Sequence, residues 1–524
     1  MIYLARPRVL VTLVFAFLGV IVLLSGTFTA VSPLDPSTPA PNYSFTIPDP
    51  DDTLICSPED DNVLLPSCHA NILRDYLPPQ EDLQAMSNQP CVNDMAGIYP
   101  CDNIDLLSFL PLSQIGGGNG NDIWGWTDPQ TGKEYALMGR SNGTAFVDIS
   151  DPYNPIYLGN LPTHTSNSTW RDIKVYQNHA FIVSEASGHG MQVFDLTQLR
   201  TVTNPPVTFS NTVHYGQFGP AHNIAINKDS GFAYVVGARN TGITCSGGLH
   251  MINIQNPTNP TFAGCFSADG YTHDTQCVIY EGPDQNYQGQ EICFNSNENT
   301  LTIVDVTNKS NPIQLSRTGY AGHGYTHQGW LTEDQHYFLV DDELDEIQNN
   351  HNTRTYVWDV SDLENPFLTG FHDGRTQAID HNLYIVDDKV YQSNYRAGLN
   401  VLRIVDLAQA ELEEFGYFDI FPSSNSANFN GTWSNYPFFN SGVIIVSGIE
   451  QGLFVLKLAE SDMITPTPGV TPSITPSVTP TPSITPTPNA TPTPIVMPTN
   501  TPVVIVPLDE RSYLPLIING AETP

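Results

Sequence analysis

The sequence is poor in basic residues and in charged residues as a whole. Only 19 Lys and Arg residues stand against 54 Asp and Glu residues in a chain of 524 residues, so the formal net charge is −35 at pH 7. A surface of this sign repels nucleic acid and anionic membranes. We therefore expect no nucleic-acid partner, and membrane or cell-envelope contact only through the terminal segments. Divalent cations and basic partners remain compatible with the charge.

The sequence also lacks the short motifs that mark the common classes of enzyme. It has no HExxH, no P-loop, no dinucleotide fingerprint, no EF-hand loop and no CxxC pair. The segment Gly139-Arg140-Ser141-Asn142-Gly143 fits G-x-S-x-G. A nucleophile elbow joins a strand to a helix, whereas strand-like runs flank this segment on both sides, so we expect a hairpin. No catalytic residue is assigned, and the sequence favours a protein that is not an enzyme.

The amino terminus has the features of an export signal. Two arginines, Arg6 and Arg8, precede an apolar run from Val9 to Leu24 and then small residues. We interpret residues 1–30 as a signal peptide or an uncleaved signal anchor. The predicted location of the protein is therefore extracellular or at the cell surface.

The chain contains eight cysteines, an even number that predicts disulfides in an exported protein. The neighbours in sequence are Cys56 and Cys68, Cys91 and Cys101, Cys245 and Cys265, and Cys277 and Cys293. The connectivity stays open, because one sequence does not determine it.

One pattern of strands occurs seven times between Asn121 and Leu458. Each copy has a short polar start, two apolar strands and a third strand that ends in an aliphatic pair and usually Asp. The residues that close these third strands are Asp148, Asp195, Asn253, Asp305, Asp359, Asp406 and Lys457. Their side chains are expected to cap the turn that follows. An all-β repeat of this length predicts a seven-bladed β-propeller.

The ends of the repeat array predict how the ring closes. Most repeats have a fourth strand after an Asn-Pro pair, but the last repeat runs straight into a Thr-Pro tract. An orphan strand, IDLLSFLPLS, precedes the first repeat and matches the fourth strand of that repeat at an offset of 51 residues. We expect residues Asp105 to Ser113 to complete the last blade and so hide its open edge.

The rest of the chain divides by composition. Residues 31–103 are interpreted as an extended lead-in with disulfide clips, and residues 104–460 as the propeller. Residues 461–503 repeat Thr-Pro units, which favour an extended, disordered stalk. Residues 504–524 are interpreted as a short tail, which serves surface attachment or processing by a sorting system, or is simply a disordered end.

The repeats resemble those of LVIVD-repeat propellers, and more closely those of the bacterial family called choice-of-anchor B. The resemblance covers about residues 104–458 and is carried by residues 121–162, 170–196, 272–284, 325–346, 378–386 and 431–456. It implies an exported domain joined to a variable carboxyl-terminal anchor. It implies no reaction.

Aligning the starts of the innermost strands brings polar pairs into equivalent positions at one end of the channel. The pairs are Asn121-Asp122, Arg171-Asp172, His222-Asn223, His273-Asp274, His327-Gln328 and His381-Asn382, while Thr432-Trp433 departs from the pattern. Imidazoles beside carboxylates suit zinc, and clusters of oxygen atoms suit calcium. The predicted metal ligands are His222, His273, Asp274, His327, Asp342, Glu343 and His381. The predicted ligand-binding residues are Asp122, Arg140, Asp172, Glu185, Arg239, Arg396 and Glu450.

Two functions follow from this ring of polar residues. The favoured one is a binding module that takes an extracellular protein, a glycan or a small ligand on its channel face. The alternative is a metal-dependent hydrolase or lyase in which Glu185, Asp342 or Glu343 acts as the base. A third reading is structural, since polar residues at strand starts can hydrogen-bond the next blade and fix the ring.

Overall fold

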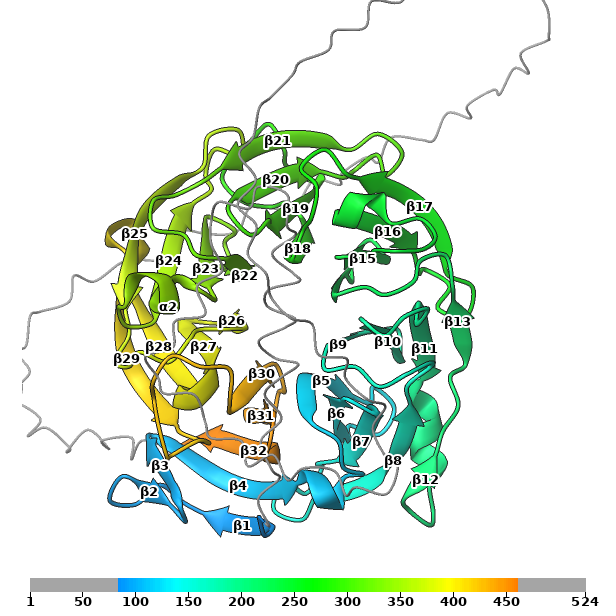
Figure 1. The fold of residues 1–524 in the computed structure, drawn as a ribbon, viewed down its shortest axis with the longest axis vertical. Coiled ribbons are helices and arrows are strands. Elements are labelled where there is room, and N and C mark those ends of the chain that lie inside the picture. Colours follow the sequence, from blue (N-terminus) through cyan, green and yellow to red (C-terminus); the bar gives the residue numbers. More distant parts are fainter. Residues whose placement is uncertain (1–82, 460–524) are drawn as a thin grey trace, which may run out of the picture. The chain divides into compact units, whose positions relative to one another are not determined.

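The computed structural model describes residues 83–459, and these residues form a ring of seven β-sheets around a common axis (Figure 1). Each sheet is one blade, with its first strand nearest the axis. The predicted all-β, seven-bladed propeller is therefore confirmed. The predicted export segment, the Thr/Pro-rich stalk, the tail, Cys56 and Cys68 lie outside the described residues.

The first five blades are each built mainly from strands that are consecutive in the chain. Blade 1 contains β5 (Gly120–Thr127), β6 (Glu134–Arg140), β7 (Gly143–Asp148) and β8 (Ile156–Pro162), with β12 (Val207–Thr208) added in parallel to β8. Blade 2 contains β9 (Arg171–Tyr176), β10 (His179–Ser184), β11 (Met191–Asp195) and β13 (Val213–Tyr215). Blade 3 contains β14 (Asn223–Asn227), β15 (Phe232–Val236), β16 (Leu249–Asn253) and β17 (Thr261–Phe266).

The other four-stranded blades repeat this order. Blade 4 contains β18 (Asp274–Ile279), β19 (Glu291–Ser296), β20 (Leu301–Asp305) and β21 (Ile313–Thr318). Blade 5 contains β22 (Thr326–Leu331), β23 (Tyr337–Asp342), β24 (Arg354–Asp359) and β25 (Phe367–Asp373). A short helix, α2 (Asp345–Asn349), lies in the connection between β23 and β24.

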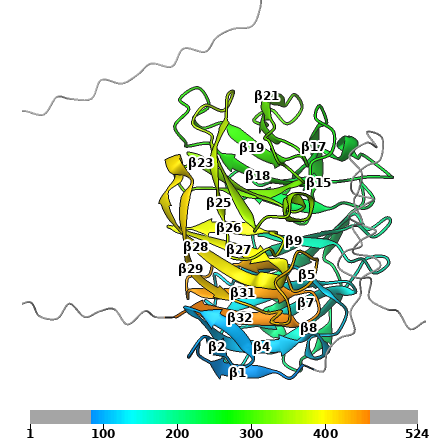
Figure 2. The same ribbon diagram turned by 60° about the vertical axis from the view of Figure 1, so that its left-hand side comes forward.

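The last two blades take strands from the amino-terminal part of the described chain. Blade 6 contains β26 (Leu383–Val386), β27 (Lys389–Asn394), β28 (Gly398–Asp406) and β29 (Glu411–Phe418), followed by β3 (Tyr99–Asp102) and β2 (Met95–Ala96). Blade 7 contains β30 (Thr432–Tyr436), β31 (Val443–Gly448), β32 (Gly452–Leu458), β4 (Ile104–Pro111) and β1 (Met86–Gln89). Figure 2 shows β4 and β1 outside β32.

The ring closes as the sequence predicts. Strand β4 pairs antiparallel with β32, with Phe109 opposite Phe454 and Asp105 opposite Lys457. The pairing contains a bulge between Val455 and Leu456, and bulges recur at this point between the third and fourth strands of five other blades. The closing strand therefore has the geometry of an ordinary fourth strand, although it comes from the opposite end of the propeller sequence.

The sequence predicted an extended lead-in over residues 31–103. Near the propeller, this segment forms β-strands that pair with the blades. Strand β1 pairs with β4, and β3 pairs with β29, so residues 86–102 add strands to two neighbouring blades. These additions cover backbone N–H and C=O groups that would otherwise lie on open sheet edges. The disulfide between Cys91 and Cys101 joins the segment between β1 and β2 to β3.

The inner strands are apolar because each blade packs against a neighbour on both faces. All six residues of β7 are buried, and all six residues of β31 are buried. A sheet covered on both faces needs nearly continuous apolar runs rather than strict alternation. This explains why the repeats appear in the sequence as aliphatic blocks.

The residues that close the third strands form capped turns, which confirms that prediction. In six repeats the side chain accepts a hydrogen bond of 2.9–3.0 Å from the backbone N–H two residues later; these residues are Asp148, Asp195, Asn253, Asp305, Asp359 and Asp406. The G-x-S-x-G segment is also as expected. It is the tight turn between β6 and β7, where Arg140 pairs with Gly143, and not a nucleophile elbow.

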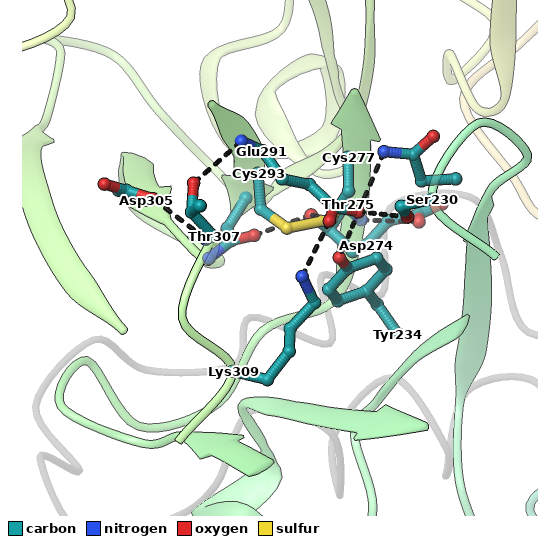
Figure 3. Close-up of a disulfide and its surroundings, with 12 residues drawn as sticks. Ser230, Tyr234, Asp274, Thr275, Cys277, Glu291, Cys293, Asp305, Thr307 and Lys309 are labelled. Atoms are coloured by element: carbon teal, nitrogen blue, oxygen red, sulfur yellow. Dashed lines mark hydrogen bonds and ion pairs between the residues drawn. A yellow bond between two sulfur atoms is a disulfide. The ribbon is translucent and has the colours of Figure 1, made fainter. Parts of the chain in front are cut away.

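Three disulfides are present among the described residues, and each joins neighbours in sequence: Cys91–Cys101, Cys245–Cys265 and Cys277–Cys293. In Figure 3 the last of these links β18 to β19 beside Glu291. Lys309 Nζ donates to the Glu291 carboxylate at 2.6 Å, and Ser230 and Tyr234 donate to it at 2.6 and 2.5 Å. This buried carboxylate is thus fully paired, as buried charges require. No helix within residues 83–459 is long and apolar enough to cross a membrane.

The contact between Asp128 and Arg200 links blade 1 to the connection after β11. Arg200 donates to both carboxylate oxygens, at 2.8 and 2.5 Å. These hydrogen bonds hold the pKa of Asp128 well below its ordinary value of 3.8. A lowered carboxyl pKa contributes stability above the unfolded-state pKa, and this contribution disappears as the pH falls toward the folded-state value.

We expect Asp128→Asn to lower the melting temperature at pH 7 and to change it progressively less below about pH 4. Thermal unfolding of both proteins followed by circular dichroism between pH 7 and pH 3 measures this difference. A difference in melting temperature that is the same at pH 3 and pH 7 would contradict the assigned role of the ion pair.

Candidate functional site

Four histidines form a continuous arc at the start of the innermost strands of blades 3 to 6. The ring centroids of His222 and His273 are 4.4 Å apart, those of His273 and His327 are 4.2 Å apart, and those of His327 and His381 are 4.4 Å apart. All four side chains are buried. The repeat spacing thus brings together residues that lie more than 150 positions apart in the chain.

Hydrogen bonds at Nδ1 orient these imidazoles. His273 Nδ1 donates to the backbone carbonyl of His327 at 2.8 Å, and His381 Nδ1 donates to the carbonyl of Trp433. His327 Nδ1 lies 2.7 Å from Asp341 Oδ1. A carbonyl only accepts, so Nδ1 carries the proton in His273 and His381, and the lone pair of a neutral ring lies on Nε2. This arrangement is typical of metal-binding histidines.

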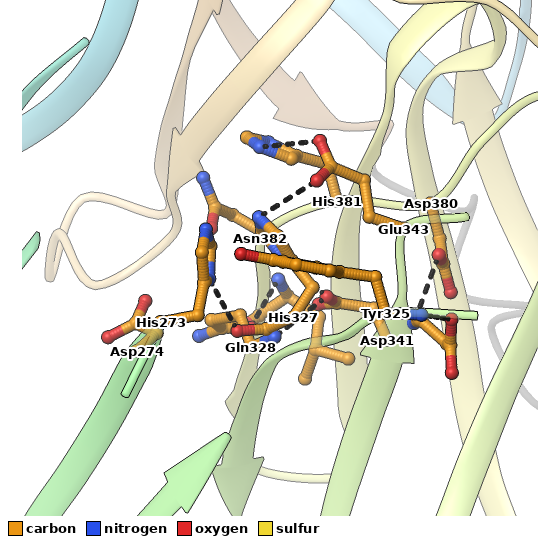
Figure 4. Close-up of polar contacts among 12 residues, drawn as sticks. His273, Asp274, Tyr325, His327, Gln328, Asp341, Glu343, Asp380, His381 and Asn382 are labelled. Carbon is orange, nitrogen blue, oxygen red and sulfur yellow. Dashed lines mark hydrogen bonds and ion pairs between the residues drawn. The ribbon is translucent and has the colours of Figure 1, made fainter. Parts of the chain in front are cut away.

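Glu343 lies between two of these imidazoles (Figure 4). One of its oxygens is 3.9 Å from His327 Nε2, and the other is 3.6 Å from His381 Nε2. The three residues offer ligand atoms that lie within 4.8 Å of one another, and all three are buried. Ligand atoms about 2.1 Å from a tetrahedral zinc ion are about 3.4 Å apart, so a small contraction brings this set into position.

Two further groups surround this set. Tyr395 donates to Glu343 at 2.6 Å, which holds the carboxylate in place. His273 Nε2 is buried and has no hydrogen-bond partner among residues 83–459. Burial, followed by the neighbouring His327 and His222, lowers the pKa of His273 well below its ordinary value. The ring is therefore neutral, which is the form that binds metal ions.

In five of the six polar pairs the second residue hydrogen-bonds to the next blade; the exception is Asp274. Asp122 Oδ2 accepts from the backbone N–H of Ile173 at 3.1 Å, and Asp172 Oδ2 accepts from that of Ile224 at 2.6 Å. Gln328 exchanges two hydrogen bonds of 3.0 and 3.1 Å with the backbone of Leu383. Hydrogen bonds of this kind are those expected if polar residues at the strand starts fix the ring. His273 and His381 also contribute, because their Nδ1 bonds reach the next blade.

Lys174 lies next to Asp122 and Asp172, two of the acidic residues of these polar pairs. Its Nζ is 2.5 Å from Asp172 and 3.5 Å from Asp122. Burial alone would lower the pKa of Lys174, but the two carboxylates raise it well above its ordinary value. Burial and Asp172 raise the pKa of Asp274 to about 7. The Asp274 carboxyl group therefore interacts with the charges of Asp172 and Lys174.

The arginines predicted to bind ligands fall into three separate places. Arg239 donates to Glu185 at 2.5 Å, and the same carboxylate is 2.8 Å from His222 Nδ1, so these three residues extend the histidine arc. Arg396 donates to Asn430 at 2.6 and 3.0 Å, and Asn430 donates to Glu450 at 2.9 Å.

Arg140 is fully buried and donates to Gly117 O and Asn160 Oδ1. It lies among backbone and side-chain groups of blade 1.

Asp342 is directed away from the histidines. It accepts hydrogen bonds from the Tyr320 hydroxyl at 2.6 Å and from the backbone N–H groups of Gly324 and Tyr325 at 2.9 and 2.5 Å. Successive residues of a strand point to opposite faces, so Asp341 and Asp342 cannot both face the channel. Of the seven predicted metal ligands, the structure brings three into one set of donor atoms, namely His327, Glu343 and His381.

Sequence reasoning missed several buried carboxylates near this set, namely Asp341, Asp345, Glu346 and Asp380. Three of them belong to the acidic run VDDELDE, and the fourth directly precedes His381. The run itself was a visible signal. Its pairing with Asp380 was not visible, because it depends on how blade 5 packs against blade 6.

The LVIVD repeat model matches residues 133–163 and 294–318. The chain carries LVIVD repeats on a β-propeller. Both stretches run from near the second strand to the fourth strand of a blade, in blades 1 and 4. A comparison with curated proteins gave no match.

Several solved structures resemble the chain at low sequence identity. The β-propeller domain of Cps50 (Swd1) from Myceliophteria thermophila is 11% identical and has a TM-score of 0.42, with 65% of this chain and 97% of that chain covered. The computationally designed Ika8 protein is 9% identical with a TM-score of 0.39, covering 64% and 82%. A protein from Lactobacillus plantarum is 13% identical with a TM-score of 0.41, covering 62% and 88%.

Proposed function

We propose that this protein is an exported propeller that binds an extracellular ligand at the histidine end of its channel. A divalent transition-metal cation held by His327, Glu343 and His381 forms the centre of the binding point. The observation that carries this proposal is the grouping of two imidazole nitrogens and a carboxylate oxygen within 4.8 Å of one another. Imidazole and carboxylate together suit zinc and similar ions.

The surroundings of the three residues support the proposal. The Nδ1 atoms of both imidazoles are engaged in hydrogen bonds, so their Nε2 atoms are oriented toward Glu343. His273 adds a neutral imidazole with an unpartnered Nε2 next to His327. Three protein ligands leave a coordination position for an oxygen or nitrogen atom of a bound protein, glycan or small ligand.

Export is supported by the disulfides and by the resemblance to choice-of-anchor B proteins. Three disulfides among the described residues suggest an oxidising, extracellular type of environment. A binding function requires a recognition surface. A channel end with a fixed cation and the neighbouring Glu185 and Arg239 offers such a surface.

The second candidate is a metal-dependent hydrolase or lyase. The observation that favours it is the number of protein ligands, because catalytic zinc sites keep a fourth position for water. Glu185 would have to act as the base in this case, since Glu343 is used as a ligand. Its carboxylate is already paired with His222 and Arg239, and this makes the binding function the better supported of the two.

We expect the wild-type protein, stripped with a chelator and reloaded, to retain about one equivalent of zinc or cobalt per chain. Replacement of both His327 and His381 by alanine should abolish this retention, because only one of the three ligands remains. Elemental analysis after gel filtration measures the stoichiometry. Cobalt absorption spectra report the coordination geometry.

His336→Ala is the matched control, because this histidine pairs with Asp359 on the outer part of blade 5 and is one-third exposed. It should leave metal retention unchanged. Failure of the wild-type protein to retain zinc or cobalt would remove the basis of the proposal. Hydrolysis of test esters or phosphoesters that is lost with the metal would instead favour the enzyme.

A further inference from the structure

A second group of carboxylates lies where blade 5 meets blade 6. Asp345 and Glu346 are in helix α2, in the connection between β23 and β24, and Asp380 precedes β26. Each offers an oxygen atom, and the three atoms lie within 4.8 Å of one another. Their side chains are 0%, 3% and 0% exposed. This group contains no histidine or cysteine ligand, so its chemistry differs from that of the histidine site.

Each of the three carboxylates has a buried oxygen with no hydrogen-bond partner among residues 83–459. These atoms are Asp345 Oδ1, Glu346 Oε2 and Asp380 Oδ2. The other oxygens are held by the protein: Tyr356 donates to Asp345 Oδ2 at 2.7 Å, and the backbone N–H of Asp342 donates to Asp380 Oδ1 at 3.2 Å. The protein thus fixes one side of each carboxylate and leaves the other side unsatisfied.

Glu291 shows how the same protein treats an ordinary buried carboxylate (Figure 3). A lysine ammonium, two hydroxyls and an amide donate to its two oxygens. No lysine or arginine of the described chain forms an ion pair with Asp345, Glu346 or Asp380. The imidazole of His351 lies 3.5 Å from Asp345. Burying several carboxylates without cations costs several kcal/mol for each ion.

We propose that Asp345, Glu346 and Asp380 bind a hard divalent cation, with calcium favoured. Carboxylate oxygens are the ligands that hard cations prefer, and calcium accepts irregular sets of them. Oxygens on opposite sides of one calcium ion lie up to about 5 Å apart, so the observed separations fit an ion among them. Magnesium demands near-ideal octahedral geometry and usually keeps several waters, for which a group this buried is poorly suited.

The alternative to a bound cation is protonation of the carboxylates. Burial and the neighbouring Asp342 raise the pKa of Asp345 to about 8, and burial and Asp380 raise that of Glu346 well above its ordinary value. Without a cation, burial favours the neutral form of these carboxyl groups. A calcium ion displaces these protons and joins α2 to the start of β26. The cation would thus clamp blade 5 to blade 6.

The test uses the full chain after treatment with EDTA. Calorimetric titration with calcium chloride should show one bound ion per chain and an increase in melting temperature. Terbium, a luminescent substitute for calcium, should emit on excitation of tyrosine, because Tyr356 contacts the group. The double variant Glu346→Gln, Asp380→Asn should weaken calcium binding by at least about tenfold, the loss expected even from removal of an outer-shell partner.

Asp373→Asn is the matched control, since this exposed carboxylate lies in the same blade and pairs with Arg354. It should leave the calcium affinity unchanged. His327→Ala should leave calcium binding intact while it removes zinc, so failure of one site is distinguishable from failure of the other. The proposal is overturned if calcium gives the wild-type protein neither a heat of binding nor a change in melting temperature. Equal calcium affinity in the wild type and the double variant would also overturn it.

Discussion

Replacing Phe109 with alanine should lower the free energy of unfolding by about 3–5 kcal/mol, the usual cost of removing a buried phenylalanine. Phe109 is fully buried on the closing strand β4, and its ring lies 4.5 Å from that of Phe454 on β32. The ring also contacts Tyr99, from the lead-in, at 6.1 Å. Loss of this side chain weakens the packing of β4 on β32, the pairing that completes the last blade. Urea unfolding followed by circular dichroism measures the change.

The control for this experiment is Ile156→Ala, on the outer strand of blade 1. This side chain is 51% exposed, so its removal should change stability by no more than about 0.5 kcal/mol. Equal unfolding midpoints for Phe109→Ala and wild type would mean that β4 does not hold the ring together. We also expect Phe109→Ala to increase proteolysis in the closing blade, because an unpaired edge opens more readily.

Replacing Lys174 with methionine should destabilise the protein by about 3–5 kcal/mol, the cost of removing one partner from a buried ion pair. The ammonium lies between Asp122 and Asp172, and its side chain is only 14% exposed. It also lies 4.6 Å from the centroid of the Trp124 ring. Without it, two carboxylates that link neighbouring blades lose their counter-charge. Urea unfolding at pH 7 measures the loss.

A rescue variant separates loss of charge from loss of packing. Adding Asp122→Asn and Asp172→Asn to Lys174→Met should restore part of the stability, because neutral amides need no ammonium partner. Lys133→Met is the control: Lys133 is 50% exposed and pairs with Asp148, so loss of this solvent-exposed ammonium should cost at most about 1 kcal/mol. If the triple variant is less stable than Lys174→Met, the charge argument is wrong.

The stability of Lys174→Met also indicates whether Asp122 and Asp172 have a structural role. Asp122 and Asp172 were predicted to bind a ligand from their place at the channel end. Their carboxylates accept backbone hydrogen bonds from the next blade, at 3.1 and 2.6 Å. A large loss of stability in Lys174→Met would show that the ring needs these charges in the absence of any ligand.

Several structural features could be read directly from the sequence because the blades are local in the chain. Most strands of each blade come from neighbouring segments, so strands and capped turns appear at nearly regular spacing. The closing strand was also accessible, because Leu107, Leu110 and Pro111 match residues of blade 1 one repeat later. The alignment of repeats further placed the four histidines next to one another, as their ring distances confirm.

The sequence could not decide which carboxylates face the histidines. Asp341, Asp342 and Glu343 are consecutive, yet Asp341 contacts His327, Asp342 contacts Tyr320, and Glu343 lies between two imidazoles. A bulge in the pairing of β22 with β23 lies between Thr326 and Gln328, close to His327. Strand alternation together with such a local irregularity sets the side-chain direction, and neither can be located from composition or spacing.

The sequence by itself determined the number of blades, the strand that closes the ring and the ring of polar residues at one channel end, because each of these follows from a repeated local pattern. Only the tertiary structure decided which of those residues meet. His327, Glu343 and His381 come together across two blades, and Asp380 meets Asp345 and Glu346 across the same junction. Contacts between blades depend on packing over distances that no repeat encodes, and the two proposed cation sites are built from such contacts.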